Sequence, residues 1–233
     1  VYRWIHRRGR ERVDGMTDLS RPVREQLEAA LAITTPAVTA REQSSDGTQK
    51  FLLTLADGLT IESVFIPDTP AMTFCVSTQV GCAMRCGFCL TGQMGLVRNL
   101  SAGEIAGQVR VLARELELQD RRFNIVLMGM GEPLFNYDNV AKSLHIIMDG
   151  DGLAISKRRI TLSTSGVVPM IERVGAELGV GLAISLHAVR DELRDVLVPI
   201  NRKYPIAQLL AACRAFAGVD RARLHDVARD VEV

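Results

Sequence analysis

The stretch TFCVSTQVGCAMRCGFC, residues 73–89, joins a β-rich run to a loop that holds three cysteines. Its first half is rich in the β-branched and aromatic residues that are typical of strands. Cys82, Cys86 and Cys89 then follow with the spacing C-x3-C-x2-C. Because parallel α/β folds carry their chemistry at the carboxyl ends of strands, the stretch predicts a functional site directly after a strand.

Outward from this stretch, predicted strands and helices alternate. SAGEIAGQVRVLARELEL (101–118) is predicted as a helix that begins with a capping box from Ser101 to Glu104. Three more strands are expected, within NIVLM (124–128), RITLST (159–164) and VGLAISL (180–186). Together with the first strand they make a parallel sheet too small to close on itself. We therefore predict an α/β fold with a parallel sheet that is at most part of a (β/α) barrel, incomplete in this chain.

Two smaller regions precede the predicted barrel, which takes residues 71–233. Residues 1–35 read as helices, and residues 36–70 as a β-hairpin linker that turns at Asp57-Gly58. The first region carries a basic run that predicts an RNA-binding accessory domain, with a solvated helix face as the alternative: Arg3, Arg7, Arg8, Arg10 and Arg12.

Composition limits the class of protein. The chain has 233 residues, of which 47% are hydrophobic, and a net charge of +1, so binding to nucleic acid must depend on local basic patches. No apolar run approaches the length of a membrane span, and we expect no membrane partner. The five cysteines fit the reducing cytoplasm better than a secreted disulfide scaffold.

The three clustered thiols are soft ligands, which suit zinc, copper(I) or an iron-sulfur cluster. A structural zinc ion would need a fourth ligand, which Cys75, Cys213 or a distant histidine would have to supply. A [4Fe-4S] cluster held by three cysteines instead leaves one iron open for an amino group and a carboxylate. We expect the cluster, with zinc or a buried structural trio as the alternatives.

Glycine-rich or polar turns follow the other predicted strands. They are GMGEP (129–133), STSG (163–166) and SLHA (185–188), and the topology points them to the same end of the sheet as the cysteine loop. Each turn alone is weak evidence, but together with a thiol cluster they predict one composite site.

The motif CAMRCGFC (82–89) has the C-x3-C-x-aromatic-C form of the radical S-adenosylmethionine (SAM) superfamily. The wider sequence, including NIVLMGMGEPLFNYDNV (124–140) and LAISLHAVRDELRDVLVPINRKYPI (182–206), resembles the RlmN branch, which methylates carbon 2 of adenine in 23S rRNA and tRNA. The resemblance implies a partial barrel of the radical SAM type, a [4Fe-4S] cluster and SAM as cofactors, and a flavodoxin-type electron donor. The related Cfr enzymes methylate carbon 8 and share these motifs, so they remain an alternative.

The resemblance also implies roles for single residues. SAM contacts fall on Gly131, Glu132, Ser163 and the run Ser185, Leu186 and His187. Taken alone, Glu132 would be a solvated loop acid and His187 a core histidine.

In the family, Glu62 corresponds to the proposed acceptor of the adenine proton, and Cys75 to the thiol that releases the product by forming a disulfide with a methyl-carrying cysteine. One SAM methylates that cysteine, and a second yields the radical that activates the methyl group. Without the resemblance, Glu62 is a surface strand residue and Cys75 a small buried side chain.

The chain departs from the family pattern near its end. No residue matches the methyl-carrying cysteine; Cys213 lies in an apolar helical run and is predicted to be core. The sequence after Gly218 stops resembling the family, which suggests a chain truncated at both ends, inactive in methyl transfer, and poorly soluble because of an unpaired strand edge. The intact protein is expected to be a cytoplasmic monomer, and a non-catalytic, metal-stapled RNA-binding module is the alternative from another class.

Overall fold

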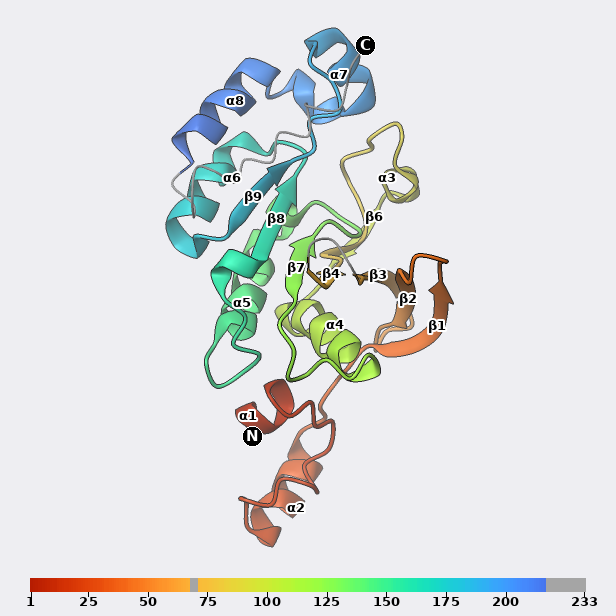
Figure 1. The fold of residues 1–233 in the computed structure, drawn as a ribbon, viewed down its shortest axis with the longest axis vertical. Helices are drawn as coiled ribbons and strands as arrows, with labels where there is room; N and C mark the ends of the chain where they lie inside the picture. The colour runs from red at the N-terminus through yellow and green to blue at the C-terminus, as the bar shows by residue number, and fades with distance from the viewer. Residues whose placement is uncertain (68–70, 217–233) are drawn as a thin grey trace.

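The computed structural model describes residues 1–67 and 71–216; the divergent segment after Gly218 lies outside these ranges. Its centre is a seven-stranded sheet with the order β1-β2-β3-β4-β7-β8-β9 (Figure 1). The four strands β4, β7, β8 and β9 are parallel, as predicted, and β1–β3 extend the sheet with antiparallel pairs. The strands span Ala37–Gln43 (β1), Gln49–Thr54 (β2), Thr60–Ile66 (β3), Thr73–Cys75 (β4), Asn124–Leu127 (β7), Ile160–Thr164 (β8) and Gly181–Ile184 (β9).

The predicted hairpin is confirmed, because β2 and β3 pair on either side of Asp57-Gly58. Gly58 has a φ of 82°, and the amide of Leu59 donates to the Asp57 carboxylate at 3.1 Å. Strand β1 was not predicted. Its side chains are almost all exposed and lack the alternation of a half-buried strand, so its position depends on pairing with β2.

The first predicted strand is divided in two. β4 ends at Cys75, and a second segment, β5 (Gln79–Gly81), leaves the main sheet to pair with β6 (Leu96–Asn99). At the break, the Gln108 side chain accepts from the amide of Ser77 at 2.8 Å and donates to its carbonyl at 2.9 Å. The side chain thus replaces the strand partner that this peptide would otherwise need.

Helices flank the sheet and its cysteine loop. The capping box of α4 is confirmed, with the Ser101 hydroxyl accepting from the Glu104 amide and the Glu104 carboxylate from the Ser101 amide. The first helix ends at His6. The helices span Tyr2–His6 (α1), Arg21–Ala30 (α2), Leu90–Met94 (α3), Ala102–Glu115 (α4), Tyr137–Met148 (α5), Val168–Arg173 (α6), Asp191–Leu197 (α7) and Ile206–Ala215 (α8), with short turns of helix at Pro133–Asn136 (η1), Lys157–Arg159 (η2), Val174–Leu178 (η3) and Pro199–Arg202 (η4).

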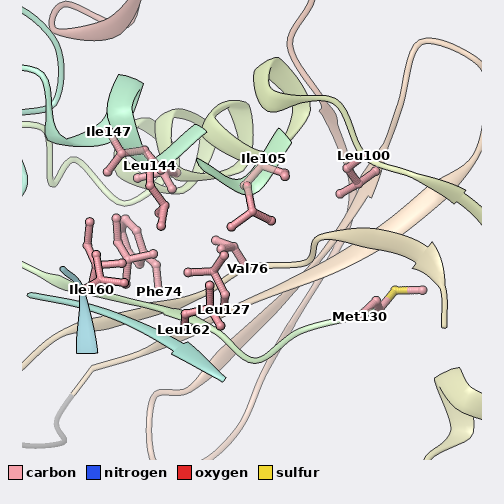
Figure 2. Close-up of a cluster of buried hydrophobic side chains, with 14 of the residues drawn as sticks. Phe74, Val76, Leu100, Ile105, Leu127, Met130, Leu144, Ile147, Ile160 and Leu162 are labelled. Atoms are coloured by element: carbon pink, nitrogen blue, oxygen red, sulfur yellow. The ribbon is translucent and has the colours of Figure 1, made fainter. Parts of the chain in front are cut away.

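The main core lies between one face of the sheet and the helices. Figure 2 shows Leu144 and Ile147 of α5 above Phe74 of β4 and Ile160 of β8. All four side chains are at most 1% exposed. Burying a side chain of this size stabilises the fold by about 1.5–3 kcal/mol. Alternate residues of β7, β8 and β9 point to the opposite face and stay only half-buried, and this face adjoins the site described below.

The N-terminal helices form a small core of their own around Trp4, Val13 and Met16. They lie at the opposite end of the molecule from α7 (Figure 1). Protein groups already engage four of the five arginines of the basic run: Arg3 pairs with Asp151, Arg7 donates to the Gly150 carbonyl, Arg8 lies over the Trp4 ring, and Arg12 pairs with Asp14 and Glu28. Within the described residues, no helix has the length and hydropathy to cross a membrane.

Candidate functional site

A cavity of about 290 Å³ lies where the cysteine loop meets the carboxyl ends of β7, β8 and β9. It is open to one side, and its volume is near the lower end of the range for small-molecule sites. Eight of the predicted site residues line it: Cys82, Cys86, Cys89, Gly131, Glu132, Ser163, Ser185 and His187. The fold therefore brings together segments more than a hundred residues apart in the chain.

Backbone contacts at both ends hold the cysteine loop. The amide of Cys82 donates to the Gly95 carbonyl at 3.0 Å, and the amide of Gly87 donates to the Leu197 carbonyl of α7 at 2.9 Å. Between them, Arg85 has a φ of 53°, a conformation that non-glycine residues adopt only with strain. The surrounding structure thus fixes the loop in a conformation that it would not adopt alone.

The three thiols suit a cluster better than a single ion. Among the described residues, no group of three His, Cys, Asp or Glu side chains converges closely enough to hold one metal ion. In a [4Fe-4S] cluster each thiolate binds a different iron, so the sulfurs lie further apart. The Met84 amide donates to the Cys82 sulfur at 3.5 Å, a contact of the kind that stabilises bound thiolates. Soft donors around an open cavity therefore fit the cluster.

Burial raises the pKa of both Cys82 and Cys86 above the ordinary thiol range. Bound iron would favour the thiolate form that ligation requires. All five cysteines are free thiols, so the disulfide bond implied by the family resemblance does not form among them.

Glu132 is buried, with 2% of its surface exposed, and is not a solvated loop acid. One carboxylate oxygen accepts from the Leu134 amide at 3.1 Å, and the other accepts from the Ser165 amide at 2.8 Å. The amide of Glu132 in turn donates to the Gln79 side chain at 2.9 Å. Burial nevertheless raises the pKa of Glu132, so a cation placed in the cavity would stabilise its ionised form.

Hydroxyl groups and one imidazole also line the cavity. The hydroxyl oxygens of Ser163 and Ser185 lie 3.4 Å apart, on neighbouring strand ends. His187 has a φ of 58°, and its ring packs at a tilt against Phe88 with centroids 4.3 Å apart. Its side chain is exposed, so it is not a core histidine. Leu186 does not line the cavity; its side chain packs against the main core.

Cys75 and Glu62 lie beside the cavity and do not line it. Cys75 pairs with Val64 in the sheet, and Glu62 is two residues from Val64, so both side chains emerge on the same, half-buried face. The Glu62 carboxylate is 3.4 Å from the Lys50 ammonium. Burial raises the pKa of Cys75 to about 11, an effect that a hydrogen bond from the Met128 backbone opposes.

Two residues at the site were missed by the sequence analysis. Gln79 orients the Glu132 backbone, and Arg194 of α7 is only 1% exposed beneath the loops that follow β8 and β9. Arg194 lies in DELRDVL, between exposed apolar and acidic residues, where an arginine is ordinarily solvated. Nothing in this local pattern indicates that it is buried.

A model of the radical SAM superfamily matches residues 76–222, well over half of the chain. The chain therefore belongs to the radical SAM superfamily. A model described as the ribosomal RNA large subunit methyltransferase N-terminal domain matches residues 1–33.

Individual relatives show which members of the superfamily the chain resembles. The chain is 51% identical to the dual-specificity RNA methyltransferase RlmN of Zymomonas mobilis and 52% identical to that of Rhodospirillum rubrum, over 96% of its own length. It spans only 59% and 54% of those two proteins. A crystal structure of a radical SAM methyltransferase from Sphaerobacter thermophilus superposes with a TM-score of 0.86 at 45% identity, covering 92% of this chain and 64% of that one. The chain is thus similar to RlmN proteins over almost all of its length.

Proposed function

We propose that this chain carries the cluster- and SAM-binding part of a methyltransferase that acts on carbon 2 of adenine in 23S rRNA and tRNA. The observation that carries the proposal is the convergence of three cysteines, one buried carboxylate and two serine hydroxyls on a single cavity. A [4Fe-4S] cluster and SAM would supply the one-electron chemistry that an unactivated aromatic carbon requires.

Cys82, Cys86 and Cys89 hold the cluster in this proposal, and Glu132 faces the ammonium group of SAM. Its carboxylate is already oriented by two backbone amides, so little further ordering is needed on binding. Ser163 and Ser185 offer hydroxyls to the ribose or the carboxylate of SAM, and His187 with Phe88 closes the outer edge of the cavity. Gly131 and the backbone of Leu186 complete this set.

Glu62 accepts the adenine proton in this proposal, and Cys75 is the thiol that attacks the covalent adduct. Their common face adjoins the cavity through Met128, whose backbone contacts Cys75 and whose side chain lines the cavity. A thiol with a pKa near 11 is a poor nucleophile at neutral pH.

Among the five cysteines of this chain, none is available as the methyl carrier. Cys213 is 7% exposed and packs into the main core, as predicted. We therefore expect the chain to bind the cluster and cleave SAM, and to transfer no methyl group.

The test is anaerobic reconstitution with iron and sulfide, followed by SAM, a chemical reductant and chromatography for 5′-deoxyadenosine. The parent chain and Cys213→Ala should both form deoxyadenosine, and Cys86→Ala should form none. Deoxyadenosine from neither the parent nor the control would contradict the proposal.

RNA recognition belongs to the same proposal. Residues 1–35 would act as an accessory RNA-binding domain beside the hairpin of residues 36–70, with a flavodoxin-type protein as electron donor and the cytoplasm as compartment. RNA affinity that decreases steeply with salt would support it, since phosphate contacts release counterions.

Mass spectrometry of RNA treated with the whole protein distinguishes 2-methyladenosine from the 8-methyladenosine of a Cfr-like enzyme. RNA binding without any deoxyadenosine would favour a non-catalytic module.

A further inference from the structure

Arg194 is the most buried cation of the described residues, with 1% of its surface exposed. Its guanidinium group binds four oxygens, all of them neutral. It donates to the carbonyl oxygens of Leu186 at 2.9 Å, Ser165 at 2.7 Å and Ser185 at 3.3 Å, and to the Asn201 side chain at 2.8 Å. Three of these bonds tie together the loops that follow β8 and β9, which form one wall of the cavity.

The charge of Arg194 is only partly balanced. Within residues 1–67 and 71–216, no carboxylate forms an ion pair with it. The nearest acidic groups, Asp191 and Asp195, lie on its own helix, where both carboxylates accept from the Asn201 amide at 2.8 and 2.7 Å. Burying an arginine with so little compensation is costly, and such costs are commonly retained for a functional reason.

The cysteine loop is the other neighbour of this cation. Ser165, whose carbonyl Arg194 binds, contacts the Cys86 thiol through its side chain, and the charges of Arg194 and Cys86 influence each other. Helix α7 also binds the loop directly, through the bond from the Gly87 amide to the Leu197 carbonyl. One short helix therefore positions both the loop and the buried cation.

We propose that Arg194 is a positioning residue that places a fixed positive charge behind Cys86 and raises the reduction potential of the cluster. The inference rests on the proposed cluster site. Net charge and burial are among the main factors that set the potential of iron-sulfur clusters. Reduction adds one electron without a proton, so a buried cation nearby stabilises the reduced form more than the oxidised form.

The test is a potentiometric titration of the reconstituted chain, with dithionite as reductant and electron paramagnetic resonance as readout. Arg194→Gln removes the charge and Arg194→Lys keeps it. Arg190→Gln, at the start of the same helix, removes an exposed charge as the matched control. We expect Arg194→Gln to lower the equilibrium constant for reduction about tenfold, which corresponds to a decrease of about 59 mV in the reduction potential of a one-electron couple. Arg194→Lys should stay close to the parent, and Arg190→Gln should shift little because solvent screens it.

Equal potentials in the parent and Arg194→Gln would overturn the inference. So would equal decreases in Arg194→Gln and Arg194→Lys, because the lost hydrogen bonds and not the charge would then explain the effect. If Arg194→Gln assembles no cluster, the lysine variant decides: a parental potential supports the role of charge, and a lowered one contradicts it. If the parent assembles a cluster but Arg194→Gln does not change its reduction potential, only this inference is refuted. If the parent assembles no cluster, the proposed function is refuted as well.

Discussion

At the scale of single residues, the site depends on groups that are costly to bury. Glu132, Arg194 and Cys86 all lie beneath the surface, and burial works against the charged form of each. Glu132 and Arg194 are each held by several hydrogen bonds, which is how buried polar groups are usually retained. Burial thus disfavours the charged form of each group, and a ligand of opposite charge would stabilise that form.

The effect of burial on the pKa of Cys75 can be tested by varying the pH. With a pKa of about 11 in place of 9.0, its thiolate fraction at pH 8 should be about a hundredfold below that of an ordinary thiol. Alkylation of Cys75 by iodoacetamide, followed by mass spectrometry, should be slow at pH 8 and accelerate through pH 10. Because the folded-state pKa is the higher one, this thiol favours folding below the unfolded pKa, and that contribution is lost as pH rises towards 11. Rapid alkylation at pH 7 in the folded protein would contradict the prediction.

The close backbone packing at Gly81, which begins the cysteine loop, can be tested by substitution. Gly81 has a φ of 76°, and a Cβ there would collide with the Gly95 carbonyl of the same hairpin. We expect Gly81→Ala to lower the free energy of unfolding by about 2–4 kcal/mol, as the sum of left-handed strain and overpacking. Gly58→Ala is the matched control, with a φ of 82° and open space around the added Cβ, and should cost about 1–2 kcal/mol. Urea denaturation measures the free energy of unfolding of both variants. Equal losses in the two variants would show that the collision with the Gly95 carbonyl is not the cause.

At the scale of elements, α4 links the fold to the site. It begins with a complete capping box, its buried stripe packs on the sheet, and Gln108 on the same helix holds the chain at Ser77, just after β4. Moving this helix would therefore move the segment that leads into the cysteines.

Serine caps of two helices should differ in strength. The Ser101 hydroxyl accepts from the Glu104 amide, whereas the Ser20 side chain makes no capping hydrogen bond in α2. Replacing Ser101 by alanine should lower the free energy of unfolding by about 1 kcal/mol, and Ser20→Ala should change it by less than about 0.5 kcal/mol. Thermal or urea unfolding followed by circular dichroism compares them. A larger loss for Ser20→Ala would show that the cap geometry of α4 is not the stabilising factor.

At the scale of the whole molecule, the sheet has two different edges. β1 carries charged and polar side chains, including Arg41 and Glu42, and is protected against edge-to-edge pairing. β9 reads Gly-Leu-Ala-Ile, and among the described strands it pairs only with β8. The sequence analysis predicted this unpaired edge.

The isolated chain should therefore self-associate through β9. We expect concentration-dependent oligomers by analytical ultracentrifugation, and a shift towards monomer in Ala183→Lys, since a charge on an edge strand opposes pairing. Ala40→Lys, on the edge that already carries charge, should leave the distribution unchanged. Identical oligomers in the parent and Ala183→Lys would show that association involves another surface.

Local patterns were sufficient for much of this protein. The Asp57-Gly58 turn, the capping box and the four parallel strands depend on residues close together in the chain, and the predictions made from them are confirmed. The superfamily predicted from the cysteine motif is confirmed as well. Tertiary structure alone decided the position of β1, the departure of β5 from the main sheet, and the burial of Glu132 and Arg194. Each of these depends on partners from distant segments, such as Gln108 for Ser77 and Ser165 for Arg194. The sequence around a charged residue in a short helix can be the same whether its side chain is exposed to solvent or buried beside a cavity. Only the tertiary structure therefore shows which of the two environments the side chain occupies.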